Sequence, residues 1–311
     1  MRGSTEKNRA RLCAALALGL LGGCSIRSIA TGALADTFAA QGDAYGRDDD
    51  PELVREAVPF ALKTMEQVLD AQPRHVGLLT ALARGFTQYG YAFVQQDADQ
   101  LAERDVVRAK EVEGRARRMY LRARDYGLRG LEIDHPGFRA AFVAGSAPVR
   151  AQALAGLKKK DVPLLYWTAA PWALAVASGK DNMKLVGELP AVEQLMARAF
   201  ELDESWDGGA IHEFYVTYDG ARTAADGGGP ERAKAHLDRA LALAENKRLS
   251  PLVSYAESVA VAAQDRKEFT RLLEQVAGAD LEKSPPDRLA NIVAQRRARW
   301  LLSRASDLFV E

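Results

Sequence analysis

Apolar residues recur at every third or fourth position along most of this chain, which is the spacing of one face of an α-helix. Strict alternation of apolar and polar residues, which marks a half-buried strand, does not run through any long stretch. Ala, Leu, Arg and Glu are frequent, whereas β-branched runs bounded by turn residues are scarce. The pattern therefore predicts an all-α fold.

Prolines, glycines and acidic residues divide this pattern into successive helices. Asp48-Asp49-Asp50-Pro51 is typical of an N-cap followed by proline at the first helical position. We prefer this interpretation to a calcium loop, which needs further spaced oxygen ligands. One helix is predicted from Ile26 to about Gln41, and the others over 51–71, 75–95, 98–130, 137–144, 147–156, 161–179, 189–203, 207–220, 230–245, 251–263, 265–277 and 285–303.

The helix over 51–71 has a predicted apolar side, formed by Leu53, Ala57, Phe60, Ala61, Thr64, Met65, Val68 and Leu69. Two later segments, 197–206 and 235–243, resemble tetratricopeptide hairpins, in which small residues let two helices approach. The strict 34-residue pattern is absent, so any repeats are degenerate. Helical hairpins of this kind share a core by stacking, which predicts an α-superhelix with a concave wall.

The first 24 residues have the three parts of a secretory signal peptide. A basic segment precedes the apolar run Leu12–Leu21, which is too short for a membrane span, and Leu21-Gly22-Gly23-Cys24 follows. This ending resembles the lipobox of bacterial lipoproteins, which implies cleavage before Cys24 and diacylglycerol on its thiol. An ordinary signal peptide and a membrane helix are the alternatives. Because Ser25, not Asp, follows the cysteine, the analogy favours the periplasmic side of the outer membrane over the inner membrane.

Cleavage would leave 288 of the 311 residues, enough for a sizeable core. We expect residues 24–50 to form an anchor and first helix, and residues 51–305 to form the helical-repeat domain. The chain has 42 basic and 42 acidic residues, so it offers no electrostatic footprint for nucleic acid. Cys13 lies in the leader and Cys24 would carry lipid, so the mature domain is expected to lack a disulfide.

Motifs for catalysis, metal binding or phosphate binding are not evident. His212-Glu213 lacks the second histidine of a zinc HExxH motif, and no cysteine remains to bind metal. Gly227-Gly228-Gly229 lacks the lysine and the strand of a phosphate loop, and Ser146 is not within GxSxG. We therefore predict no catalytic residue, metal or cofactor, and no enzyme activity. A carboxylate pair converging in a cleft, as in a hydrolase, remains the enzymatic alternative.

Aromatic residues gather in three places. In the first group, Phe86, Tyr89 and Phe93 share one predicted helical face and Tyr91 lies on another. The second group is Tyr166, Trp167 and Trp172. The third group follows His212 and consists of Phe214, Tyr215 and Tyr218. These rings fill the core in the simpler interpretation, which we favour for Phe86, Phe93 and Phe214. Tyr and Trp also carry a polar tip that needs a partner, as in small-molecule sites.

The mature chain as a whole resembles the TatT family, periplasmic lipoproteins associated with TRAP (tripartite ATP-independent periplasmic) transporters. The resemblance covers roughly residues 24–303, and its segments are 48–57, 59–60, 62–66, Pro73, 78–94, 163–167, Trp172 and 209–213. It implies a helical fold with cryptic tetratricopeptide-like repeats, a periplasmic substrate-binding protein as partner, and a homo-oligomer, with a trimer as one form. It also implies a cavity or pore for a small organic or apolar ligand.

The residues expected to line this cavity are Tyr89, Tyr91, Tyr166, Trp167, Trp172, His212 and Tyr215. The alternative is a tetratricopeptide-like scaffold lipoprotein that assembles envelope machinery and binds no ligand. A helical superhelix is expected in both cases. An internal channel lined by Tyr and Trp favours the first function, whereas a packed interior favours the second.

Overall fold

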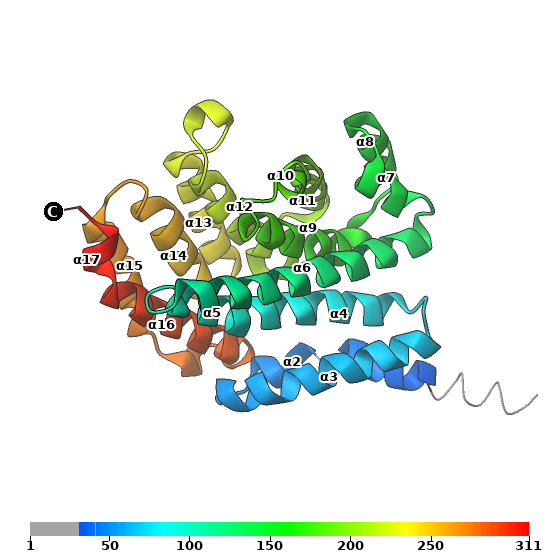
Figure 1. Ribbon diagram of the computed structural model, residues 1–311, viewed down its shortest axis with the longest axis horizontal. Coiled ribbons are helices and arrows are strands. Elements are labelled where there is room, and N and C mark those ends of the chain that lie inside the picture. Colours follow the sequence, from blue (N-terminus) through cyan, green and yellow to red (C-terminus); the bar gives the residue numbers. More distant parts are fainter. Residues whose placement is uncertain (1–30, 41, 311) are drawn as a thin grey trace, which may run out of the picture.

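The computed structural model describes residues 31–40 and 42–310, and within these residues every regular element is a helix (Figure 1). The predicted all-α fold is therefore confirmed for this part of the chain. The predicted leader, Cys24 and the start of the first predicted helix lie outside the described residues. None of the helices described is both long enough and apolar enough to cross a membrane.

Residues 31–40 are helical. They are followed in chain order by α2 (Gly42–Gly46), α3 (Pro51–Ala71), α4 (Val76–Tyr89), η1 (Gly90–Gln95), α5 (Gln96–Leu101), α6 (Val106–Asp134), α7 (Phe138–Ala144), α8 (Ala147–Ala155), η2 (Lys159–Asp161), α9 (Val162–Ala177), α10 (Met183–Val186), α11 (Leu189–Asp203), α12 (Trp206–Gly220), η3 (Ala224–Asp226), α13 (Pro230–Leu243), α14 (Ser250–Tyr255), η4 (Ala256–Ala260), α15 (Arg266–Ala277), η5 (Leu281–Lys283), η6 (Pro285–Asp287), α16 (Arg288–Ser303) and α17 (Ala305–Leu308).

Capping residues explain where the predicted helix bounds succeed and fail. The Asp50 carboxylate accepts hydrogen bonds from the backbone N–H groups of Glu52 (3.0 Å) and Leu53 (3.1 Å), so α3 begins as predicted. The helix predicted over 98–130 is wrong at its start, because α4 continues through η1 and α5 to Leu101. Asp105 then caps a new helix, accepting from the N–H of Arg108 (2.9 Å). The short helices α10 and α17 were not predicted.

The buried side of α3 differs from the predicted one. Leu53 and Phe60 are 57% and 78% exposed, whereas Val54 and Leu62 are buried. Met65, Val68 and Leu69 are buried as predicted. Because apolar residues occur on two sides of α3, periodicity alone could not decide which side faces the core.

Helices that are near in sequence also pack together in space. α6 lies against α4 on one side and α9 on the other, α9 contacts α11, and α12 pairs with α13 (Figure 1). The contact of α6 with α9 depends on Gly127, where a Cβ atom would lie 2.1 Å from Thr168 Oγ1. This order is what stacked hairpins require, and the regular superhelix itself stays a prediction.

The C-terminal helices return to the N-terminal ones. α16 contacts both α2 and α3. The Arg296 guanidinium lies 2.5 Å from the Glu52 carboxylate, and Trp300 Nε1 donates to Glu103 Oε1 at 2.9 Å. The helical array therefore closes on itself, and it surrounds a cavity where its two ends meet.

Candidate functional site

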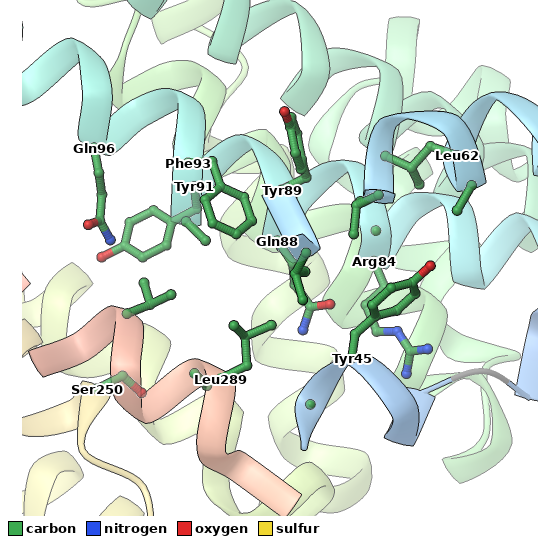
Figure 2. Close-up of a pocket in the computed structure, with 18 of the residues that line it drawn as sticks. Tyr45, Leu62, Arg84, Gln88, Tyr89, Tyr91, Phe93, Gln96, Ser250 and Leu289 are labelled. Carbon is green, nitrogen blue, oxygen red and sulfur yellow. The ribbon is translucent and has the colours of Figure 1, made fainter. Parts of the chain in front are cut away.

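A cavity of about 360 Å³ lies where α2, α3 and α4 meet α12, α14 and α16 (Figure 2). This volume is within the range of small-molecule sites, roughly 300–1,000 Å³. Its walls are formed by Phe38, Tyr45, Gly46, Val54, Val58, Ala61, Leu62, Met65, Ala81, Arg84, Gly85, Gln88, Tyr89, Tyr91, Ala92, Phe93, Gln96, Glu213, Ser250, Val253, Leu289, Ala290, Val293, Ala294 and Arg297. Most of these side chains are apolar, and a few are polar or charged.

The longest wall is one continuous helix, made of α4, η1 and α5. Its middle part, η1, is a π-helix, which is rare and occurs often at functional sites. Gly90 begins this segment, and a Cβ atom there would lie 2.9 Å from the Tyr120 ring of α6. The Tyr89 and Phe93 rings, 5.3 Å apart, lie on either side of the segment's start and line the cavity.

Tyr91 belongs to the π-helical segment, and its side chain lines the cavity. It is 41% exposed, yet burial is the largest cause that raises the pKa of its hydroxyl, followed by the charge of Glu257. The exposed part of the ring faces the cavity, and the surrounding helices limit its contact with bulk water. Tyr91 therefore offers a hydroxyl and an aromatic face to whatever occupies the cavity.

Gln96 carries a hydrogen-bond donor with no partner. The side chain is only 7% exposed, and its Nε2 atom has no hydrogen-bond partner among the described residues. In Figure 2 the Gln96 amide lies near the Tyr91 hydroxyl group, at one end of the cavity. A buried donor without a partner costs roughly 1–3 kcal/mol, so pairing of this amide with an acceptor would be favourable.

Charged groups come to this end from distant parts of the sequence. Arg297 Nη1 lies 2.6 Å from Asp99 Oδ2, and its Nη2 lies 2.6 Å from Glu257 Oε1. Glu213 lines the cavity, and burial raises the pKa of its carboxyl, with Ser250 and Arg248 opposing the shift. Among the described lining residues Glu213 is the one carboxyl group, and Arg84 and Arg297 are the two cations.

A left-handed turn sets the direction of the helix that carries Glu213. Asp207, Gly208 and Gly209 have φ values of 47°, 59° and 90°, so the regular part of α12 begins after them. Asp207 is not glycine, and Arg248 holds it by donating to its carbonyl oxygen and, at 2.8 Å, to its Oδ1. The helix predicted over 207–220 is therefore correct in extent but not at its first turn.

Of the residues predicted to line a cavity, Tyr89 and Tyr91 lie on this one, and Tyr166, Trp167, Trp172, His212 and Tyr215 do not. Tyr166 of α9 packs against Trp206 of α12, with ring centroids 4.8 Å apart, and Trp172 Nε1 donates to Glu188 Oε2 at 2.8 Å. These five side chains find partners between helices, and a ligand role for them stays a prediction.

His212 and Tyr215 belong to a separate polar cluster. His212 Nδ1 lies 2.8 Å from His236 Nδ1, and the Tyr215 ring stacks on His236 with centroids 4.9 Å apart. Burial is the main cause that lowers the pKa of both histidines. Within the described part of the chain, no three His, Cys, Asp or Glu side chains are placed to hold a metal ion.

Sequence reasoning missed the polar residues of the cavity. Arg84, Gln88 and Gln96 interrupt an otherwise apolar helical face at spacings of four and eight, and this was the available local signal. Glu213 and Arg297 come from helices more than one hundred residues away, so nothing near them in the sequence indicated a shared site.

Two comparisons place the chain among known proteins. A family model described as "TRAP transporter T-component" matches residues 47–309. A protein of Treponema pallidum (strain Nichols), named "Uncharacterized protein", is 29% identical over 306 residues, which are 94% of this chain and 95% of that protein. The similarity to this relative therefore extends over nearly the whole length of both proteins.

Proposed function

The chain belongs to the TRAP transporter T-component family, and from this premise we propose that it is a periplasmic accessory lipoprotein that docks a solute receptor and holds a small organic ligand. This membership confirms the resemblance predicted from the sequence. It makes the protein a component of a transporter system, and the family is not a family of enzymes. Receptor docking, the ligand and the lipid anchor are the parts that we propose.

The ligand role is supported by one observation above the others, the unpartnered amide of Gln96 in a largely apolar cavity. Packed cores rarely leave both a void and a buried donor without a partner. A small molecule that fills the void and accepts a hydrogen bond would remove both costs. A pure scaffold would have no use for this arrangement.

The anchor and the location are proposed from the lipobox. Acylation of Cys24 would tether the helical domain to a membrane on its periplasmic side, with the outer membrane favoured by Ser25. The partner and a homo-oligomeric state, including a trimer, are proposed from the family alone. A tethered protein that holds the ligand near the receptor would raise the local concentration of the solute at the transporter.

Affinity capture tests the docking role. The full-length chain with a C-terminal tag is expressed in the bacterium that produces it, and proteins recovered from the envelope are quantified by mass spectrometry. We expect a TRAP solute receptor to be enriched over a control capture with an unrelated tagged lipoprotein. Recovery of cell-envelope assembly proteins without any receptor would instead favour the scaffold function.

A further inference from the structure

We infer that the cavity binds an amphipathic organic anion in one orientation, with its anionic group at Arg84 and its apolar body extending toward Gln96. This inference rests on the proposed ligand role of the cavity. It adds the chemical class of the ligand and the residue that holds its charge. Three features of the cavity wall support it.

The first feature is an arginine with no partner. Arg84 of α4 is half-buried and lines the cavity, and within the described residues it forms no ion pair and no hydrogen bond. Arg297, the other lining cation, is held by two carboxylates. A guanidinium in a largely apolar wall gains most from a carboxylate or phosphate, with which its planar fork forms paired hydrogen bonds.

The second feature is the opposite charge at the other end. Tyr91 lies near Asp99 and Glu257, two carboxylates that share the single guanidinium of Arg297, and near the buried carboxyl group of Glu213. Another anion there would be repelled, and no acidic residue lines the Arg84 end among the residues described. The field along the cavity therefore fixes the orientation of a molecule with one negative group.

The third feature is an apolar stretch between the two ends. In Figure 2, Arg84 and Tyr45 lie toward one end of the cavity and Gln96 and Tyr91 toward the other. Leu289, Tyr89 and Phe93 lie between them. Arg84 and Gln96 are twelve residues apart on one continuous helix, so their backbones are roughly 18 Å apart. The unpartnered Gln96 amide would meet a neutral acceptor or a water molecule at the far end of the ligand.

Binding of decanoate and of the uncharged 1-decanol tests this inference. The full-length acylated protein is placed in lipid nanodiscs, and equilibrium dialysis with radiolabelled probe measures binding above that of empty nanodiscs. We expect decanoate to bind more tightly than decanol. Arg84→Gln should weaken decanoate binding at least about tenfold and leave decanol binding within about twofold.

Matched variants separate the charge from the fold. Arg115→Gln removes an exposed arginine of α6, and should change neither affinity. Arg84→Lys keeps the charge and should retain part of the decanoate affinity. Thermal unfolding of each variant checks that the fold is intact.

Equal binding of the two probes by the wild type, or equal losses of both in Arg84→Gln, would overturn the inference. So would an Arg84→Gln protein that binds decanoate like the wild type. If decanoate does not bind while the protein retains another small molecule and captures its receptor, the inference is wrong and the proposed function stands. If it retains no small molecule of any class, the proposed ligand role also fails.

Discussion

Arg297 Nη1 lies 2.6 Å from Asp99 Oδ2, although 198 residues separate them in the sequence. The same guanidinium binds Glu257, so it joins α16 to α5 and to η4 at the Tyr91 end of the cavity. Burial lowers the pKa of Arg297, but the carboxylates more than offset this effect, so the pKa lies above its ordinary value. The side chain therefore stays charged, and it closes the helical array.

We predict that Arg297→Leu lowers the free energy of unfolding by roughly 3 kcal/mol, because two partly buried carboxylates lose their partner. Urea unfolding followed by circular dichroism measures this value. Arg296→Leu is the matched control, since it breaks the more exposed pair with Glu52 on the same helix and should cost less than about 1 kcal/mol. Similar losses in the two variants would mean that Arg297 does not close the array.

A second prediction concerns Glu213. Its pKa is raised in the folded protein, so its contribution to stability is fully present below the ordinary pKa of 4.5 and is lost as the pH rises through the folded value. Glu213→Gln cannot ionise, and it should raise the melting temperature at pH 8 more than at pH 5. Thermal unfolding at both pH values checks this. A gain that is the same at both would show that ionisation is not the cause.

A third prediction concerns His212 and His236, whose effect on stability changes with pH in the opposite direction to that of Glu213. Burial lowers the pKa of His212 and His236, and the charge of His236 lowers that of His212 further, while Glu204 and Asp219 oppose these shifts. A base with a lowered pKa supports the fold above its ordinary value of 6.5 and costs stability as the pH falls below it. Arg239 and Arg232 also face the pair and act in the same direction as burial.

We therefore expect the wild-type melting temperature to fall between pH 7.5 and 5.5, and to fall less in His236→Gln. This substitution removes one titrating ring and the charge that acts on the other. Scanning calorimetry across this pH range measures the two slopes. An unchanged slope in the variant would assign the acid sensitivity to other groups.

A fourth prediction concerns the anchor. Cys24→Ser should abolish acylation and move the protein from the detergent phase to the aqueous phase in a phase-partition assay, because the thiol is the proposed lipid acceptor. Cys13→Ser is the matched control, since Cys13 lies in the predicted leader and should be removed with it. Labelling with palmitate detects the lipid directly. Acylation that persists in Cys24→Ser would refute the proposed anchor.

The sequence predicted the fold well because local rules decide most of it. Helix starts at Pro51 and Pro230 follow from proline at the first helical position. The start of α6 was missed because a continuous periodic pattern hid Asp105, the N-cap of a new helix. The exposed Leu53 and Phe60 show the limit of periodicity, which finds apolar faces without saying which face is covered.

The candidate site could be predicted only in part. Tyr89 and Tyr91 could be predicted as lining residues because they lie in a segment of one helix that is rich in aromatic residues. The π-helical turn at Gly90 changes the angular positions of later residues, and an α-helical spacing cannot describe it. Glu213 and Arg297 reach the cavity through the closure of the array, which depends on tertiary contacts that no local pattern encodes.

The most direct test of a ligand-holding cavity is native mass spectrometry of the protein purified from the envelope of its own bacterium. The wild type should carry a small organic molecule that collisional activation releases. Ala92→Phe, which fills the cavity, should lose it, and Ala140→Phe, on the exposed side of α7, should keep it. A wild type that carries no such molecule, or an Ala92→Phe protein that retains it fully, would contradict the account.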